Sequence, residues 1–138
     1  MNAIDTNIWI YRFDSRDAAK QQVAAQLTAT VRPQVLLWQV GCEFVAASRK
    51  LGAFGFTEDQ AWRALADMQI IASQVALPDQ QVWTDAQALH QRHGLSFWDA
   101  LLVAACIRAG VQTLYTEDIG APRTLDGISL VNPFLAKP

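Results

Sequence analysis

Apolar residues follow two different spacings along the chain. Short apolar runs of strand length occupy residues 1–5, 35–38, 111–116 and 128–131, and a further short strand is expected within 70–77. Between these runs, apolar residues recur at the three- and four-residue spacing of helices. Short apolar strands that alternate with helices are typical of a parallel sheet covered by helices on both faces. The sequence therefore predicts a single α/β domain over residues 1–138.

Capping residues and helix breakers set the expected helix boundaries. Ser15, Thr57 and Ser96 can each cap a helix, Pro78 can begin one, and Gly52 can end one. With the apolar spacing, these signals predict helices over residues 8–13, 16–30, 39–51, 58–68, 78–94 and 97–109. The last of these has one charge in its first eleven residues. We therefore expect it to be central and buried.

The composition is that of one globular domain. Hydrophobic residues make up 51% of the 138 residues, which is enough to form one core. A chain of this length is too short for two ordinary domains. The longest nearly uninterrupted apolar run, residues 100–107, is far shorter than the roughly 20 residues that span a bilayer. No basic segment followed by an apolar one opens the chain. We therefore expect a cytoplasmic protein without membrane association.

The charge distribution argues against a DNA-binding module. The formal net charge is −2, and Arg49–Lys50 is the one adjacent basic pair. Proteins that bind nucleic acid through a broad basic face usually carry a clear positive excess. Any contact with nucleic acid is therefore expected to be local or drawn in through a bound metal, with no direct DNA binding by this chain alone.

Cysteine and tryptophan positions give two further expectations. Cys42 and Cys106 fall in apolar helical patterns without metal-ligand spacing, so we expect buried thiols. The five tryptophans fall mostly at helical core spacing, which favours core packing or a partner groove over base stacking. Trp9 and Trp62 are the two for which partial exposure is expected.

Four acidic residues break the apolar pattern. Most of the thirteen acids occupy first helical turns or polar faces, where a solvated surface explains them: Asp14, Asp17, Glu58, Asp59, Asp67, Asp79 and Asp85. Four others lie where a core or a strand end is expected: Asp5, Glu43, Asp99 and Asp118. A buried carboxylate is costly unless it is paired or bound to a cation. These four therefore require an explanation.

Each of the four also has an ordinary structural explanation. Asp5 can cap the following helix, and Glu43 can be an exposed helical acid. Asp99 lies on an apolar helix face, but with Ser96 it also forms an S-x-x-D capping pattern. Asp118 can be a turn aspartate. No single position decides between a structural and a functional role.

Taken together, the four acids predict a metal site. The carboxyl ends of parallel strands meet at one rim, where ligands bind, and Asp5 and Asp118 both follow predicted strands. Like charges raise one another's pKa values, so such a cluster is explained best by a hard divalent cation. Oxygen ligands favour Mg²⁺ or Mn²⁺. Such a site can activate water for phosphodiester hydrolysis without a protein nucleophile.

Four segments place these acids in a known order. They are Ile-Asp-Thr-Asn-Ile at 4–8, Val-Gly-Cys-Glu-Phe at 40–44, the segment 94–105, and Leu-Tyr-Thr-Glu-Asp at 114–118. They resemble the motifs of PIN-domain nucleases, in particular the VapC-type toxins of bacterial toxin–antitoxin pairs. Asn-Pro-Phe at 132–134 resembles a common family ending, so the resemblance covers nearly the whole chain. Residues 119–123 depart from the family, many of whose members carry a His-Gly-Gln-like stretch there, and this departure bears on substrate choice.

The resemblance implies a PIN-like fold and a role for eight residues. Those that bind metal and activate water would be Asp5, Glu43, Asp99 and Asp118. Those that orient the carboxylates or the scissile phosphate would be Thr6, Asn7, Ser96 and Thr116. The resemblance also implies a Mg²⁺-dependent endoribonuclease toxin, a homodimer, and a VapB-type antitoxin that blocks the site and binds DNA.

Two other functions stay open at this point. One is a housekeeping PIN nuclease of RNA processing that has no antitoxin. The other is a catalytically silent PIN-like scaffold, although the presence of all four acids favours an enzyme. The sequence does not identify the target RNA.

Overall fold

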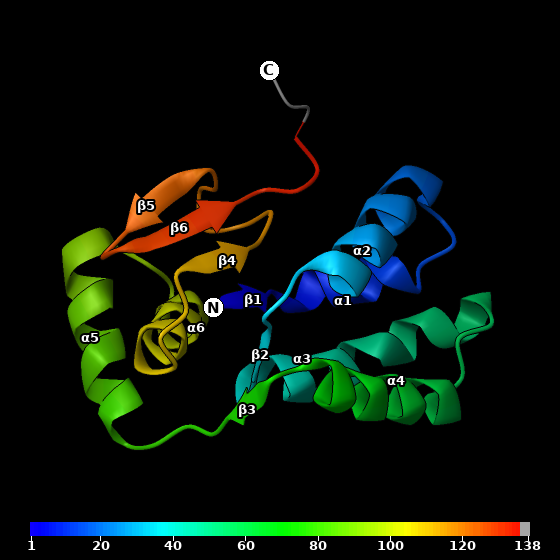
Figure 1. Ribbon diagram of the computed structural model, residues 1–138, viewed down its shortest axis with the longest axis horizontal. Helices are drawn as coiled ribbons and strands as arrows, with labels where there is room; N and C mark the ends of the chain where they lie inside the picture. The colour runs from blue at the N-terminus through cyan, green and yellow to red at the C-terminus, as the bar shows by residue number, and fades with distance from the viewer. Residues whose placement is uncertain (136–138) are drawn as a thin grey trace.

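The computed structural model describes residues 1–135, which form an α/β domain (Figure 1). The strands are β1 (Asn2–Ile4), β2 (Val35–Leu37), β3 (Gln74–Ala76), β4 (Thr113–Tyr115), β5 (Arg123–Leu125) and β6 (Ile128–Val131). The helices are α1 (Thr6–Arg12), α2 (Ala18–Thr30), α3 (Trp38–Ser48), the 3₁₀ helix η1 (Arg49–Phe54), α4 (Glu58–Ile71), α5 (Gln81–His93) and α6 (Phe97–Arg108).

The central sheet is mostly parallel, as predicted. Its strand order is β1-β4-β6-β5, and the β1–β4 and β4–β6 pairs are parallel. Ile4 pairs with Tyr115, which in turn pairs with Val131, so these three strands end at the same rim. Strands β2 and β3 form a second parallel pair, joined to the first sheet by a bridge between Asn2 and Gln34.

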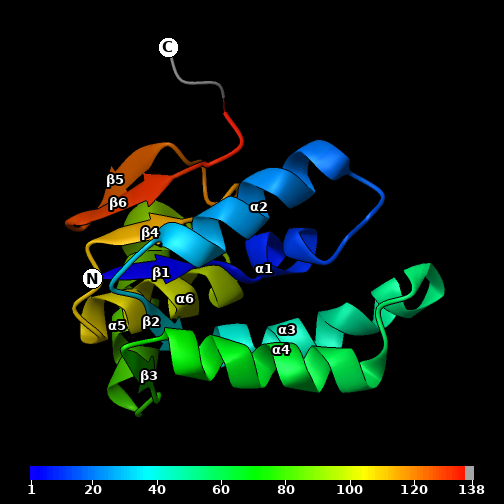
Figure 2. The same ribbon diagram turned by 45° about the vertical axis from the view of Figure 1, so that its right-hand side comes forward.

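Helices cover both faces of the sheet. In Figure 2, α2 passes in front of β1 and α6 lies behind it. Helix α5 packs against α6, while α1 packs against α2 and α3. Fully buried side chains from all these layers, including Ile8, Phe44, Val103, Leu114 and Leu130, form one core. Burial of these side chains holds the strand ends and the helix starts in fixed relative positions.

Strand β5 was absent from the sequence prediction. It pairs antiparallel with β6, and two residues of positive φ, Asp126 and Gly127, join the two strands. Two exposed residues, Arg123 and Thr124, precede the buried Leu125, so no apolar run marks this edge strand. The Asp-Gly pair is the hairpin signal that could have revealed it.

The start of α2 lies later than predicted. Asp17 caps the helix by accepting a hydrogen bond from the Lys20 N–H at 3.1 Å, whereas Ser15 lies outside it. The preceding turn is fixed by Asp14, which accepts bonds from the backbone and guanidinium of Arg16. Asp14 is buried, so its assignment to the solvated acids was wrong. The paired Arg16 lowers the pKa of Asp14 through its hydrogen bonds.

Two other predicted boundaries were also displaced. Helix α3 ends at Ser48, and the chain continues as η1 through Gly52 until Gly55, whose φ of 91° ends it. Helix α5 begins at Gln81, three residues after Pro78. The predicted caps Thr57 and Ser96 are confirmed, and Thr57 forms a full capping box. In the described part of the chain, no helix is long and apolar enough to cross a membrane.

The exposure of tryptophans differs most from the prediction. Trp9 is buried at 3% exposure, whereas Trp38, Trp83 and Trp98 are between 52% and 68% exposed. The exposure expected for Trp62 is confirmed, at 53%. The prediction that α6 is central and buried is confirmed for most of the helix, but its first two residues, Phe97 and Trp98, are exposed. Cys106 is buried as expected, but Cys42 is exposed. Helical spacing identifies an apolar face, but it does not show whether that face meets the core or solvent.

Candidate active site

Asp5 continues strand β1 into the rim of the sheet. Its N–H donates to the Tyr115 carbonyl at 2.9 Å, which extends the β1–β4 ladder by one residue. Its carboxylate is buried and accepts two hydrogen bonds, from the Thr6 N–H at 2.7 Å and from Thr116 Oγ1 at 2.8 Å. The backbone ladder and these two donors together fix the direction of the carboxylate.

Thr116 links Asp5 with Asp118. The same hydroxyl that donates to Asp5 accepts a hydrogen bond from the Asp118 N–H at 3.0 Å. On the other side, Asn7 donates from Nδ2 to Asp118 Oδ2 at 3.1 Å. Residues from β1, α1 and the segment after β4 therefore meet at one point, although they are more than a hundred positions apart in sequence.

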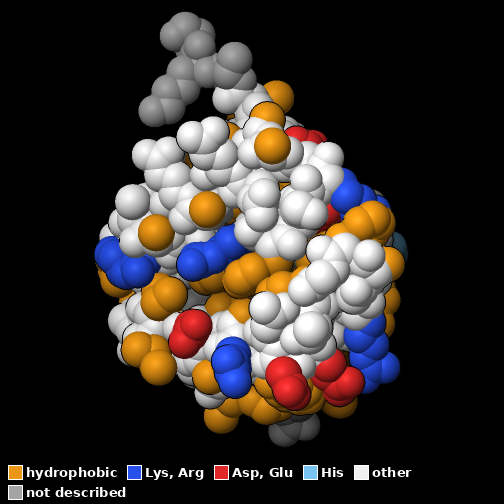
Figure 3. Space-filling model, turned by 90° about the vertical axis from the view of Figure 1, so that its right-hand side faces the viewer, with side chains coloured by type: hydrophobic (Ala, Val, Ile, Leu, Met, Phe, Trp, Pro, Cys, Tyr) orange, Lys and Arg blue, Asp and Glu red, His pale blue; other side chains and the backbone are white. Residues whose placement is uncertain are grey.

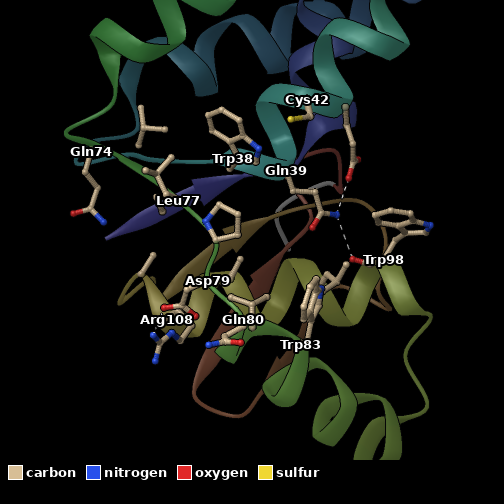
Figure 4. A pocket seen from close by; sticks show the side chains of 18 of the residues that line it. Trp38, Gln39, Cys42, Gln74, Leu77, Asp79, Gln80, Trp83, Trp98 and Arg108 are labelled. Carbon is tan, nitrogen blue, oxygen red and sulfur yellow. Dashed lines mark hydrogen bonds and ion pairs between the residues drawn. The ribbon is translucent and has the colours of Figure 1, made fainter.

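Glu43 reaches the same rim from α3. Its carboxylate accepts one hydrogen bond from Thr6 Oγ1 at 3.2 Å and another from Gln39 Nε2 at 2.6 Å. Gln39 also donates to the Trp98 carbonyl at 3.3 Å, which ties α3 to the first turn of α6 (Figure 4). The sequence analysis missed Gln39. Its position one helical turn before Glu43 was the available signal.

The three carboxylates influence one another electrostatically. Burial is the main reason that the pKa of Asp5 is raised from 3.8 to about 6, and the charges of Asp118 and Glu43 raise it further. The hydrogen bonds from Thr116 and Thr6 act in the opposite direction. A carboxylate held this way is ionised at a cost, and a nearby cation would offset that cost.

Asp99 lies at the start of α6, beside the residue that Gln39 contacts. Its N–H donates to Ser96 Oγ at 3.2 Å, so the capping role expected for this pair exists. Asp99 is only partly buried, and within residues 1–135 no side chain donates a hydrogen bond to its carboxylate. The structure therefore joins Asp5, Glu43 and Asp118 through hydrogen bonds but leaves Asp99 outside that network.

The oxygen atoms available as metal ligands at this rim suit a hard divalent cation. They are carboxylate, hydroxyl and amide oxygens, which suit Mg²⁺ and Mn²⁺. Within residues 1–135, no three acidic, histidine or cysteine side chains lie close enough together to hold one ion as they stand. Coordination would therefore require rotation of the acids that are at least partly exposed, Glu43, Asp99 and Asp118.

Three of the four polar residues expected to orient the carboxylates contact them directly. Thr6 donates to Glu43, Asn7 to Asp118, and Thr116 to Asp5. Ser96 caps α6 and touches the backbone of Asp99 rather than its carboxylate. A hydroxyl or amide that is fixed in this way restricts the orientation of an acid.

An apolar groove begins at the acidic rim. It has a volume of about 1440 Å³ and lies between α3, the β3–α5 connection, α5 and α6. Trp38, Leu77, Trp83 and Trp98 line it, and all four side chains are exposed (Figure 4). Glu43 also lines the groove, so the rim and the groove are continuous.

Charged residues on the face formed by the α1–α2 connection and the η1–α4 region are mixed in sign. Figure 3 shows acidic and basic side chains scattered over this face, around a hollow with hydrophobic side chains. The residues that line a hollow of about 280 Å³ between α1 and α4 include Trp9, Arg12 and Phe56. No single-sign field covers this face, in agreement with the net charge of −2.

Residues 3–124 match the PIN domain family. Because this match spans most of the chain, the protein belongs to the PIN domain family. No curated protein matches the chain in sequence.

The fold is similar to that of solved toxin structures. A toxin–antitoxin complex from Klebsiella pneumoniae is 20% identical, with a TM-score of 0.69 over 96% of this chain and 98% of that one. The sarcin-ricin loop cleaving toxin VapC20 from Mycobacterium tuberculosis is 22% identical, with a TM-score of 0.62 over 86% and 90% of the two chains. VapBC2 from Rickettsia felis, bound to a promoter DNA fragment, is 15% identical, with a TM-score of 0.63 over 94% and 96%. At these identities the likeness establishes a shared fold.

Proposed function

We propose that this protein is a metal-dependent endoribonuclease that acts as the toxin of a toxin–antitoxin pair. The observation that carries the proposal is the hydrogen-bonded set at the strand ends, in which Thr116 joins Asp5 to Asp118 and Thr6 joins that pair to Glu43. Membership of the PIN domain family and the shared fold with VapC20 support the same function.

The proposed metal is Mg²⁺, with Mn²⁺ as a substitute. Asp5, Glu43, Asp99 and Asp118 would hold it, Asp5 as the buried ligand and the others from the partly exposed rim. When bound, such an ion lowers the pKa of a coordinated water and stabilises charge on the phosphate oxygens.

Other residues of the chain would position and orient the metal-binding carboxylates. Thr116 fixes Asp5 and the backbone of Asp118, and Gln39 holds Glu43 against the start of α6. These contacts restrict the carboxylates before substrate arrives, which reduces the reorganisation needed for the reaction. Ser96 would keep Asp99 in the first turn of α6.

Cleavage of purified RNA tests this function directly. We expect the wild-type protein to cut a single-stranded RNA when Mg²⁺ is added and to stop when EDTA is added. Asp67→Asn, which alters an exposed acid on α4, is the matched control and should cleave like wild type. A protein that binds Mg²⁺ without cutting any RNA would instead support the silent scaffold.

The proposed partner is a VapB-type antitoxin. A basic side chain from the antitoxin, Arg or Lys, would enter the rim because a cation there offsets the burial of the Asp5 carboxylate and its repulsion by Asp118 and Glu43, which together raise the pKa of Asp5. Expression of this chain alone should arrest growth, and co-expression of the antitoxin should restore it. Normal growth with abundant soluble wild-type protein would favour the housekeeping nuclease.

We also propose that a second copy of the chain covers the apolar groove. The face presents both protruding tryptophans and the hollow between them, as a self-complementary two-fold interface requires. Exposed aromatic patches of this kind are characteristic of interfaces. Trp83→Glu should convert a dimer into a folded monomer in sedimentation experiments, and a wild-type monomer at micromolar concentration would contradict the proposal.

A further inference from the structure

Glu117, which lies between two rim residues, is held on the opposite side of the chain. Its Oε1 accepts a hydrogen bond from the Tyr11 hydroxyl at 2.5 Å, and its Oε2 accepts one from Lys20 Nζ at 2.8 Å. Lys20 also donates to the Tyr11 hydroxyl at 3.2 Å. The cluster therefore ties α1 and α2 to the segment that follows β4.

Aromatic rings surround the ammonium of Lys20. The Nζ lies 4.5 Å from the centre of the Tyr11 ring and 5.0 Å from that of Phe134. These two rings pack edge to face at 5.2 Å. The Lys20 and Glu117 side chains are 34% and 18% exposed, so this ion pair is better shielded from water than an ordinary surface pair.

The position of Glu117 in the sequence gives this cluster a consequence for the rim. Side chains of an extended segment alternate in direction. Thr116 and Asp118 make rim contacts with Asp5 and Asn7, while Glu117 is bound to α1 and α2. If Glu117 were released, a second carboxylate would be free beside Asp118. Residues 116–118 would also lose their side-chain attachment to α1 and α2 and keep only the contacts at the rim.

We propose that Lys20 is a positioning residue for Asp118. By holding Glu117 against Tyr11, Lys20 fixes the orientation of residues 116–118. Of the two neighbouring acids Glu117 and Asp118, only Asp118 is then left to face the metal site. The inference rests on the proposed function for the identity of that site. Within residues 1–135, neither Lys20 nor Tyr11 forms a hydrogen bond with Asp5 or Asp118, so both would act through Glu117.

The test compares Lys20→Met, which keeps the length of the side chain but removes its charge, with Lys20→Arg, which keeps the charge. Lys50→Met is the matched control, because Lys50 is exposed and lies in η1. Three experiments are combined: electron paramagnetic resonance measures Mn²⁺ binding to the purified protein, thermal unfolding in EDTA gives the melting temperature, and cleavage assays give kcat and KM for RNA as a function of Mg²⁺.

We expect Lys20→Met to weaken Mn²⁺ binding about tenfold and to raise the Mg²⁺ concentration for half-maximal cleavage by a similar factor. The KM for RNA at saturating Mg²⁺ should change little, Lys20→Arg should recover most of the metal affinity, and Lys50→Met should match wild type. Tyr11→Phe removes only the hydroxyl that Glu117 accepts from, and it should show a smaller loss in the same direction. This variant keeps the test valid if Lys20→Met folds poorly.

Wild-type Mn²⁺ binding in Lys20→Met and Tyr11→Phe, with only a lower melting temperature, would overturn the inference and leave a purely structural ion pair. Absence of Mn²⁺ binding by the wild-type protein would also overturn it. If wild type binds Mn²⁺ in a Lys20-dependent way but cleaves no RNA, the positioning role stands and the proposed ribonuclease function fails.

Discussion

The acidic rim and the apolar groove meet at Gln39 and Glu43, but their side chains are in opposite situations. At the rim, each of Asp5, Glu43 and Asp118 accepts hydrogen bonds from neighbouring residues. Throughout residues 1–135, every buried side-chain polar atom has a partner. In the groove, large apolar side chains such as Trp83 and Leu77 remain exposed.

The two regions therefore differ in how far their side chains are already ordered before a ligand or partner binds. The rim is organised only in part, because hydrogen bonds already fix the buried Asp5, whereas Glu43, Asp99 and Asp118 would still have to rotate to bind an ion. The groove gains free energy only when a partner covers it, since exposed apolar surface is stabilised by burial. Mutations of the partly exposed rim acids should therefore change chemistry with little change in folding, whereas mutations in the groove should change association.

The largest expected effect is loss of cleavage in rim variants. Asp5→Asn and Asp99→Asn should each reduce Mg²⁺-dependent RNA cleavage at least a hundredfold, because each removes a proposed ligand. Asp99→Asn keeps the backbone N–H that donates to Ser96 Oγ, so its metal-free stability should change by at most about 1 kcal/mol. Cleavage assays combined with urea denaturation in EDTA measure both quantities.

Asp99 is the position at which this prediction could fail. It lies outside the hydrogen-bonded network, and an acid in the first turn of α6 is favourable for the helix even without a metal. A fully active Asp99→Asn protein would remove Asp99 from the site and restrict the rim to Asp5, Glu43 and Asp118.

A pair of tryptophans tests the other half of the comparison. Trp9 is 3% exposed and Trp83 is 68% exposed. Trp9→Ala should lower the free energy of unfolding by about 3–5 kcal/mol, as is typical for a large buried side chain. Trp83→Ala should change it by less than about 0.5 kcal/mol at concentrations where the protein is monomeric. Equal losses in the two variants would mean that the groove belongs to the core.

The two regions also differ in how well the sequence predicted them. Asp5 and Glu43 were identifiable because a carboxylate within an apolar pattern is costly and needs a reason. Convergence at the rim followed from parallel strands, whose carboxyl ends meet. The fold was predictable for the same reason, since apolar runs and helical spacing mark β1, β4, β6 and the main helices.

The sequence did not distinguish core tryptophans from groove tryptophans. Trp38 and Trp98 stand at the starts of α3 and α6, each within two residues of a buried side chain, and their spacing equally fits a core position. Exposure depends on whether another element packs against that side, which is a property of the tertiary structure. The pairing of Glu117 with Lys20 was hidden for the same reason, because 97 positions separate the two residues.

The pH dependence of stability should report on Asp5. Because burial and neighbouring charge raise its pKa from 3.8 to about 6, the folded state binds a proton more tightly than the unfolded state. In EDTA, the contribution of Asp5 to the free energy of unfolding should therefore fall by roughly 3 kcal/mol as pH rises from about 4 to about 6. Asp5→Asn should lack this part of the slope. The measurement is urea denaturation of the wild-type and Asp5→Asn proteins from pH 4 to pH 8. The same dependence of the free energy of unfolding on pH in both proteins would contradict a raised pKa of Asp5.

The smallest expected effects come from the two cysteines, one of which lines the groove while the other is buried in the core. Cys42 is exposed and lines the groove, whereas Cys106 is buried in α6, where burial and, to a smaller extent, Asp5 raise the pKa of its thiol. Ellman's reagent should modify one thiol quickly in the native monomer and the second only on unfolding, because the thiolate is the reactive form and Cys106 is inaccessible. Cys42→Ser should remove the fast phase and change the free energy of unfolding by less than about 0.5 kcal/mol.

Since a second copy over the groove would shield Cys42, its modification should slow as protein concentration rises, while Cys106 stays unreactive. Equal rates for both thiols in the native protein would contradict the burial of Cys106 in α6 and show that this side of the helix is open to solvent.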